Sequence, residues 1–411
     1  MSVFPNYLVT NFAGDSVSIV DAATQTIIGT VNDTLGPFSG PFVVTITPDG
    51  TTAFVANRGN DTVSVIDIAT QTVTGIVDDT FAPYIRPSMV IYTLDGSTAF
   101  ITSEGSNIVA VMDVATRTVT GTVADGAGPF STPNALSITP DGVTIFVGND
   151  NNTVSIINVA TQAVTGLVDG ALGPFSQPII AAITPDGTIA FITNQSNNTV
   201  SVMNVVTQAV TGTVNGVLGP FSTPEIAAIT SDGTTAFVTN LTDNTVSIIN
   251  VGTQTVTGIV NDTLGPFSGP TGIAITSDGT TAFVTNSSGA SVSIIDIATQ
   301  AVTGVISDPF ATLAGPFWIA IISSTSADFS VSGKAGKDNF LTESNVFVKL
   351  SWNAPAAGTF QIYRDSKLVG TIQGQGALEF TDNNLKSKKT YTYRVVGLNG
   401  GLEKTLVIKA R

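Results

Sequence analysis

Arginine and carboxylate side chains carry most of the chemical potential of this sequence, because its 411 residues include no histidine and no cysteine. Histidine is the usual general base near neutral pH and the commonest metal ligand, and cysteine supplies thiolate nucleophiles, thiolate ligands and disulfides. Any reaction must therefore rely on Asp, Glu, Arg, Tyr or backbone groups. On these grounds we expect no bound metal and no cofactor.

Basic residues are scarce in the first part of the chain. Residues 1–325 contain three of them, Arg58, Arg86 and Arg117, against 23 acidic residues, which gives this part a formal charge of −20. Residues 326–411 contain 12 basic and 7 acidic residues, a charge of +5. Such a break in composition marks a domain boundary. A strongly acidic body repels phosphate backbones, so we do not expect nucleic acid as a partner.

Two of the three arginines belong to a predicted surface patch. The loop 81–87 carries Tyr84 and Arg86 where related loops carry Phe and a small residue, and Arg58 and Glu104 lie in neighbouring loops. Tyr and Arg are enriched at binding hot spots, so the patch predicts a contact with a ligand or a partner. The alternative is a local Arg–Glu pair at the surface, worth under ~1 kcal/mol.

The elements that position these residues belong to a repeat. The tetrapeptide Thr-x-Asp-Gly recurs in steps of 45 or 46 residues, starting at Thr47, Thr93, Thr139, Thr184, Thr230 and Thr276. Variants of Phe-Val-Thr-Asn, of Asn-Thr-Val-Ser-Ile-Ile-Asn and of Ala-Thr-Gln-Thr-Val-Thr-Gly keep the same phase. A fixed period of this length is typical of a repeat architecture.

Each repeat reads as four short strands, which in the first complete unit span residues 42–46, 52–56, 62–66 and 72–77. These segments are rich in Val, Ile, Thr and Phe, which favour strands, and Gly, Pro, Asn and Asp mark the turns between them. No segment sustains a 3.6-residue period. Four strands per repeat, stacked so that each covers its neighbour, predict an all-β propeller with four-stranded blades.

The two ends of the repeat region supply a seventh blade. Six units are complete, and the chain begins within a unit whose second, third and fourth strands are residues 7–11, 16–20 and 26–31. The missing first strand is the in-phase segment Ile319–Ile321. Pairing these strands would cover edges that otherwise invite aggregation. We therefore predict a seven-bladed propeller closed by its N- and C-terminal strands.

The loops before the first strands are predicted to surround the mouth of the central channel. Their Gly-Pro-Phe-Ser segments would place Phe between blades, with an exposed aromatic ring for carbohydrate stacking as the alternative. The residue after each loop proline would line the mouth: Phe42, Ser88, Asn134, Ile179, Glu225, Thr271 and Phe317, which Trp318 follows. Glu225, Phe317 and Trp318 are thus candidate binding residues, with channel packing as the alternative. A lone carboxylate does not make the facing pair of a glycosidase, so no catalytic residue and no metal ligand is predicted.

The repeats resemble the YVTN propeller-repeat family. Tyr7–Asn11 and six Phe-containing versions of the Tyr-Val-Thr-Asn strand carry the likeness, over residues 6–322. The resemblance implies a propeller fold and a likeness to surface-layer and other exported prokaryotic proteins, many of which have no assigned activity.

A second, smaller domain follows. Strands are expected at residues 346–352, 359–363, 367–372, 378–381, 391–396 and 404–409, which suggests a β-sandwich. Trp352 and the run Leu385 to Tyr391-Thr392-Tyr393-Arg394-Val395 resemble a fibronectin type III domain. In that family the tyrosine six residues after the leucine forms the tyrosine corner, and Tyr391 would fill this role. Lys386-Ser387-Lys388-Lys389 replaces the Pro-Gly usual in that corner.

These features predict a propeller at residues 1–322, a linker at 323–337 and a fibronectin type III-like sandwich at 338–411. The main functional prediction is a non-enzymatic scaffold, exported or at the cell surface, whose propeller binds a protein or glycan partner. One alternative is a propeller-type hydrolase or lyase, similar to a lactonase and disfavoured by the lack of histidine. Another is a soluble protein–protein interaction hub. We expect a monomer, no membrane-spanning segment and an extracellular or cell-surface location, with no signal peptide in this sequence.

Overall fold

The structure is a computed structural model that divides into two compact units, Met1–Ser323 and Ser324–Arg411, each of which is described by itself. It describes residues 6–21, 24–81, 83–124, 130–169, 175–214, 221–307, 313–322, 331–339, 344–365, 367–382, 385, 389–397 and 403–409.

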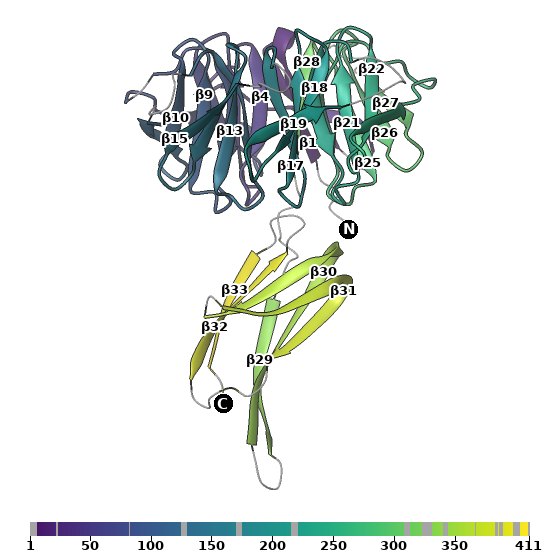
Figure 1. Cartoon of the computed structure of the whole chain (residues 1–411). Coiled ribbons are helices and arrows are strands. Elements are labelled where there is room, and N and C mark those ends of the chain that lie inside the picture. The colour runs from purple at the N-terminus through teal and green to yellow at the C-terminus, as the bar shows by residue number, and fades with distance from the viewer. Residues whose placement is uncertain are drawn as a thin grey trace. The chain divides into compact units, whose positions relative to one another are not determined.

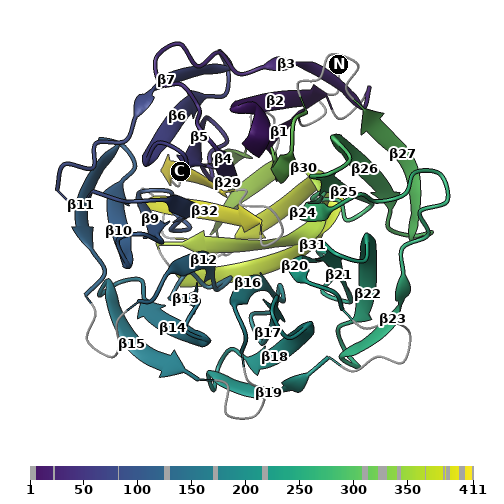
Figure 2. The ribbon, with the colours of Figure 1, turned by 90° about the horizontal axis from the view of Figure 1, so that it is seen from above.

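The described part of the first unit forms seven four-stranded antiparallel sheets arranged as blades around a central axis (Figure 2). From the axis outward, the closing blade is β28 (Pro316–Ile321), β1 (Asn6–Asn11), β2 (Ser16–Asp21) and β3 (Thr26–Thr30). The next three blades are β4 (Pro41–Ile46), β5 (Thr52–Asn57), β6 (Thr62–Asp67), β7 (Thr72–Ile76); β8 (Pro87–Tyr92), β9 (Thr98–Ser103), β10 (Ile108–Asp113), β11 (Thr118–Thr122); and β12 (Pro133–Ile138), β13 (Thr144–Asn149), β14 (Thr153–Asn158), β15 (Ala163–Val168). The last three are β16 (Pro178–Ile183), β17 (Ile189–Asn194), β18 (Thr199–Asn204), β19 (Ala209–Thr213); β20 (Pro224–Ile229), β21 (Thr235–Asn240), β22 (Thr245–Asn250), β23 (Thr255–Ile259); and β24 (Pro270–Ile275), β25 (Thr281–Asn286), β26 (Ser291–Asp296), β27 (Ala301–Ser307). The predicted seven-bladed, all-β fold is confirmed.

The ring closes by pairing of the two ends of the repeat region. Strand β28 runs antiparallel to β1, with Tyr7 opposite Ile321 and Val9 opposite Ile319. Ile322 N–H donates to the Asn6 carbonyl and extends this pairing by one residue. Strands from opposite ends of the propeller therefore share one sheet, as the repeat phase predicts.

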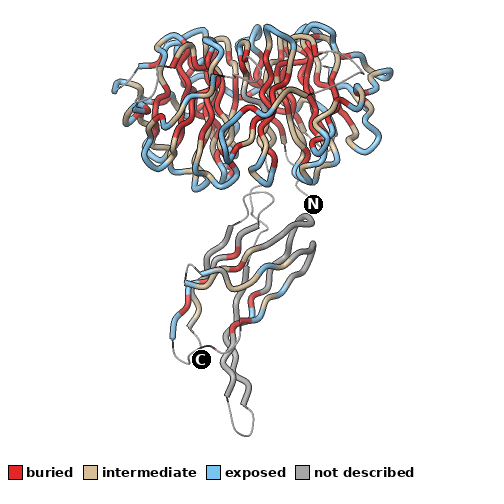
Figure 3. The backbone as a smooth tube through the Cα atoms, in the orientation of Figure 1, coloured by how far each residue is buried: buried red, intermediate tan, exposed pale blue. Residues whose placement is uncertain are grey.

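The core of the propeller lies between adjacent blades. One cluster combines Leu8 and Ile19 of the closing blade with Val44 and Val55 of the next blade. Phe38 from the connecting loop is buried in the same cluster, and Phe130, Phe175, Phe221 and Phe267 are buried in the corresponding loops. The predicted role of the loop Phe as a plug between blades is confirmed. Figure 3 shows buried residues along the strands and exposed residues at the loops.

The outer edges of neighbouring blades are also linked by backbone hydrogen bonds. Asn32 N–H donates to the Gln71 carbonyl, and Val73 N–H donates to the Asn32 carbonyl, which forms a short parallel bridge between blades. Similar bridges join Asp78 to Thr118, Ala124 to Ala163 and Asn261 to Ala301. These backbone bridges at the outer edges and the side-chain packing between adjacent blades together hold the blades in register.

The second unit is a five-stranded antiparallel sheet (Figure 1). Its strands are β29 (Val331–Asn339), β30 (Ser344–Arg364), β31 (Lys367–Asp382), β32 (Thr390–Gly397) and β33 (Glu403–Lys409), and β30 pairs with β29, β31 and β32. β30 and β31 each join two strands that were predicted separately, because their pairing continues across an irregular register between Ala354 and Gly358. Leu385 and Tyr391 lie in the core of this unit, whereas the Trp352 side chain lies outside the described part.

The helical content of the described residues is one short 3₁₀ turn, η1 (Phe12–Gly14), at the channel mouth. Among these residues no helix has the length and apolar character needed to cross a membrane.

Candidate functional site

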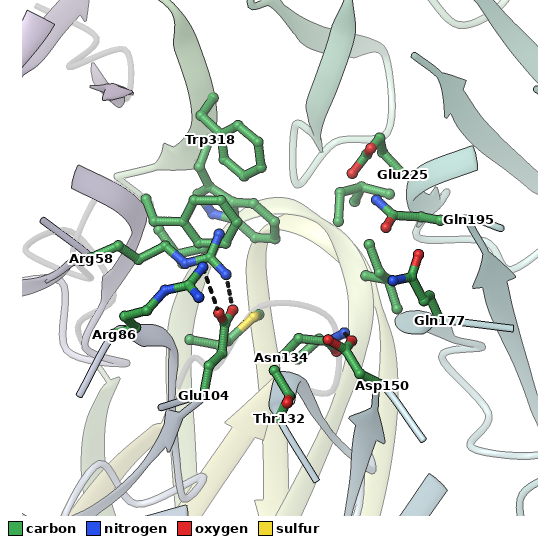
Figure 4. Close-up of a pocket in the computed structure, with 17 residues that line it drawn as sticks. Arg58, Arg86, Glu104, Thr132, Asn134, Asp150, Gln177, Gln195, Glu225 and Trp318 are labelled. Carbon is green, nitrogen blue, oxygen red and sulfur yellow. Dashed lines mark hydrogen bonds and ion pairs between the residues drawn. The ribbon is translucent and has the colours of Figure 1, made fainter. Parts of the chain in front are cut away.

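One end of the central channel opens into a pocket of about 360 Å³. Its walls are formed by the first strands of several blades, by the loops before these strands and by the loops between the second and third strands. Six of the seven residues proposed from the sequence as binding residues line this pocket: Arg58, Arg86, Glu104, Glu225, Phe317 and Trp318 (Figure 4). Departures from the repeat therefore converge on a single concave site.

Tyr84, the seventh of these residues, does not line the pocket. Its side chain is buried in the core between two blades, with Val63, Val90 and Ile101. Tyr84 follows Phe38 by 46 residues and precedes Phe130 by the same step, so it occupies the position of the plug. The prediction that it belongs to a surface patch is wrong, because this repeat position packs an aromatic ring between blades.

The residue that precedes each loop proline adopts a left-handed backbone, at φ between 47° and 61°. Three blades place Gly at this position, whereas four consecutive blades place Arg86, Thr132, Gln177 and Thr223 there. A side chain in this conformation carries a backbone strain that Gly avoids. An Asp or Asn of the preceding blade holds the strained residue, as Asp61 does by accepting from Arg86 N–H at 2.7 Å. Arg86, Thr132 and Gln177 reach the pocket from these positions.

A second repeat position contributes the charged and amide groups. The residue after the last residue of each second strand is Arg58, Glu104, Asp150 or Gln195 in four consecutive blades, and all four line the pocket. The last residue of each of these second strands holds the loop before the first strand of the same blade. Asn149, at the end of β13, accepts through Oδ1 from Ser131 N–H at 3.4 Å. Ser103, at the end of β9, accepts through Oγ from Ile85 N–H at 2.9 Å.

The third position, after the loop proline, lines the pocket in five blades. Phe42, Asn134, Ile179, Glu225 and Phe317 do so, as predicted. Ser88 and Thr271 occupy the same position but are buried, and their hydroxyls donate to backbone carbonyls of the next blade, those of Asn134 and Phe317. The predicted ring of seven therefore reduces to five, because small hydroxyl side chains satisfy the neighbouring backbone.

Arg58 and Arg86 both point at the carboxylate of Glu104 (Figure 4). Arg58 forms a close ion pair with Glu104 Oε1, and Arg86 Nη2 lies 3.3 Å from Glu104 Oε2. The Glu104 side chain is only 3% exposed, whereas those of Arg58 and Arg86 are 20% and 57% exposed. Two cations thus share one buried anion, which leaves the cluster with a net positive charge. The arrangement differs from the surface Arg–Glu pair considered from the sequence, because Glu104 is buried and pairs with two arginines.

Removing Arg58 is expected to destabilise the propeller far more than removing Arg86. Arg58→Ala leaves the buried Glu104 carboxylate with one partner, the 57% exposed Arg86, so we expect a loss of about 3 kcal/mol in the free energy of unfolding. Arg86→Ala removes a half-exposed partner and should cost under about 1 kcal/mol. Urea unfolding of the two variants measures the difference, and equal losses would show that Glu104 is not held mainly by Arg58.

Aromatic side chains form the wall next to the arginines. The rings of Phe42 and Phe317 stack with centroids 4.1 Å apart, and Phe12 lies 6.2 Å and 6.4 Å from them. The Arg58 guanidinium lies over the Phe42 ring, 3.9 Å from its centroid, an arrangement favoured by cation–π attraction. Trp318 lines the same pocket (Figure 4). We call Phe12, Phe42, Phe317 and Trp318 the aromatic wall.

Carboxyl groups with raised pKa values lie elsewhere in the pocket. Burial raises the pKa of Glu225 to about 7, although a hydrogen bond from Gln195 lowers it in part. Burial also raises the pKa of Asp150, against a hydrogen bond from Asn134 Nδ2 at 3.0 Å. Together with Glu104, these residues give the pocket three carboxyl groups. The predicted ring of residues at the channel mouth contained only one, that of Glu225. Within the described residues, no group of three or more acidic side chains is placed to hold a metal ion.

The family of this chain follows from a comparison with family models. The model described as "Lactonase, 7-bladed beta-propeller" matches residues 8–226, more than half of the 411 residues. The chain belongs to this lactonase family. The match contradicts the main functional prediction, a non-enzymatic scaffold, and favours the alternative, a propeller-type hydrolase or lyase. Burial raises the pKa of Glu225 to about 7, so this chain has a carboxyl group that titrates near neutrality although it has no histidine.

Solved structures share the fold of this lactonase-family propeller at low sequence identity. A functionally unknown protein from Desulfotomaculum acetoxidans has a TM-score of 0.59 and 19% identity, over 77% of this chain and 98% of that protein. Hydrazine synthase from Kuenenia stuttgartiensis has a TM-score of 0.53 and 22% identity, over 63% and 77%. The dihydro-heme d1 dehydrogenase NirN has a TM-score of 0.56 and 12% identity, over 78% and 75%. No curated protein sequence matches the chain.

Proposed function

We propose that the propeller hydrolyses a lactone in the channel-mouth pocket, with Glu225 as the general base. The observation that carries the proposal is the buried carboxyl of Glu225, whose pKa of about 7 suits proton transfer at neutral pH, in a pocket that also holds two arginines. Membership of the lactonase family supports the reaction class.

The side chains present can serve each step of ester hydrolysis. The Glu225 carboxylate would take a proton from a water molecule as the water oxygen attacks the lactone carbonyl carbon. The carbonyl oxygen then becomes an oxyanion, which a guanidinium can stabilise. When the ring C–O bond breaks, the proton held by Glu225 passes to the departing alkoxide. This transfer returns Glu225 to its ionised form, and the hydroxy acid gives its carboxyl proton to water to become the carboxylate product.

Gln195 would orient the base. Its side chain hydrogen-bonds the Glu225 carboxyl, and the Thr193 hydroxyl donates to the Glu225 backbone carbonyl at 2.6 Å. These contacts fix both ends of the residue. A carboxylate with its ordinary pKa would be a weak base, so the burial of Glu225 is what suits it to this role.

The remaining parts of the chain carry finer proposals. The seven repeats are of the YVTN type, supported by the matching strand motif in every blade. The second unit is a fibronectin type III-like accessory domain, supported by the packing of Leu385 with Tyr391 and Tyr393 in its core. A location outside the cytoplasm and a monomeric state remain predictions.

Hydrolysis of a lactone panel tests the proposed function. The full-length chain, treated with a chelator of divalent ions, should release acid from at least one lactone at a rate well above the uncatalysed rate, followed in a pH-stat. Acyclic esters of the same acids serve as controls for non-specific esterase activity. Absence of turnover across γ- and δ-lactones, or turnover abolished by the chelator, would overturn the proposal.

A further inference from the structure

We infer that the substrate carries an aromatic ring, which the aromatic wall binds while the lactone faces the carboxyl groups. This inference rests on the proposed function and adds the substrate class to it. The first observation is the exposure of the wall. Phe42, Phe317 and Trp318 line the pocket and are only partly buried, although these large apolar side chains would normally be covered. Phe12 is 43% exposed and packs against Phe42 and Phe317 beside the pocket.

The second observation is the asymmetry of the pocket. The wall comes from two adjacent blades, the closing blade and the β4–β7 blade. Equivalent positions in other blades carry Asn134, Asp150, Gln195 and Glu225, with Ile179 as the apolar exception, so the opposite side of the pocket is mostly polar (Figure 4). A ligand that fills the pocket should therefore have one flat apolar part and one polar part.

The third observation is the position of the positive charge. The Arg58 guanidinium lies over the face of the Phe42 ring, and Arg86 pairs with the same Glu104 carboxylate as Arg58. Two of the three basic residues in a region with a formal charge of −20 thus line this pocket. Lactone hydrolysis creates a carboxylate, and a guanidinium next to an aromatic wall suits an aryl-substituted carboxylate product.

A sugar ring is the competing occupant, because its C–H face can also stack on aromatic side chains. The wall favours an aryl group, since Phe12, Phe42 and Phe317 offer no hydrogen-bonding atom to hydroxyls that surround a sugar ring. Phe42 and Phe317 are stacked, and Phe12 meets Phe42 edge-on. An aryl group of the substrate would pack against the wall through the same two kinds of contact.

A pair of lactones with equal ring size tests the inference by kinetics. Isochroman-3-one and δ-valerolactone are both six-membered lactones of primary alcohols, and the first carries a fused benzene ring. We expect kcat/KM to be at least about tenfold higher for isochroman-3-one. In Phe42→Leu/Phe317→Leu this ratio should fall toward one, whereas Phe81→Leu, at a residue 67% exposed and outside the pocket, should leave it unchanged. A preference for δ-valerolactone or for glucono-δ-lactone would overturn the inference.

A binding measurement separates this inference from the proposed reaction. Phenylacetate should bind the full-length chain in isothermal titration and should change the fluorescence of Trp318, one of only two tryptophans in the sequence. Acetate should do neither, and Phe42→Leu/Phe317→Leu should lose the phenylacetate signal. Phenylacetate binding without lactone turnover would refute the reaction and keep the aromatic subsite. Lactone turnover without phenylacetate binding would refute the subsite and keep the reaction.

Discussion

Glu225→Gln is expected to lower kcat/KM for lactone hydrolysis by about 10²- to 10⁴-fold, because the amide keeps the shape of the side chain and cannot accept a proton. Glu379→Gln is the matched control, since it makes the same chemical change at an exposed residue of the second unit. That control should retain full activity. Equal activity of Glu225→Gln and the unaltered protein would remove Glu225 from the reaction.

The same substitution should stabilise the propeller above neutral pH, which separates lost chemistry from misfolding. Burial raises the pKa of Glu225 from 4.5 to about 7 in the folded protein. The folded state therefore holds this proton more tightly, and the free energy of unfolding falls by roughly 3 kcal/mol as pH rises from below 4.5 to above 7. The amide of the variant does not titrate, so the variant has no such loss.

Urea unfolding at about pH 4 and about pH 8 measures this linkage. At the lower pH the side chain at position 225 is neutral in both the unaltered protein and the variant, so the two should have similar stability. At the higher pH the Glu225→Gln protein should be more stable by roughly 3 kcal/mol. A variant that is less active and also less stable at about pH 8 would indicate structural damage, not loss of a base.

Deleting residues 1–31 is expected to abolish folding of the propeller to a soluble monomer. The deletion removes β1, β2 and β3, so β28 loses its pairing partner and the closing blade disappears. It also removes Leu8, Val17 and Ile19 from the core shared with the next blade. Two blade faces and an unpaired strand edge would then be exposed, which favours aggregation.

Size-exclusion chromatography with light scattering, together with thermal melting, measures this effect. Deletion of residues 1–5, which precede β1, is the control and should leave a cooperative melting transition. If the chain without residues 1–31 were a monomer that melts cooperatively, the closing contact between β28 and β1 would not be needed for the fold.

The repeat made much of the fold predictable. The 46-residue phase located every strand of the seven blades and the pairing of residues 7–11 with 319–321, because equal repeats must form equal elements. In the second unit, without a repeat, the alternation of residues indicated strands but not their joining through the irregular register at Ala354 and Gly358. Alternation indicates which face of the sheet a side chain occupies and does not indicate whether pairing continues across an irregular register.

The site was predictable in part, by departures from the repeat. Arg58, Arg86, Glu104 and Glu225 were found in this way, whereas Asp150, Gln177 and Gln195 were missed although they occupy the same repeat positions as Arg58, Glu104 and Arg86. Comparing all blades at those two positions would have found them. The pKa of Glu225 could not be predicted, because it depends on burial by residues distant in the sequence. The interpretation of the chain as a non-enzymatic scaffold is overturned by the match to the lactonase family, which the repeat pattern alone did not reveal.

The pH dependence of kcat/KM for lactone hydrolysis tests the central claim most directly, because this quantity reports the ionisation of the free enzyme's base. Since the ionised form of Glu225 is the base, kcat/KM should rise with pH and reach half of its maximum near pH 7. The residual activity of Glu225→Gln should lack this transition. A profile without a transition near pH 7, or the same transition in Glu225→Gln, would contradict the account.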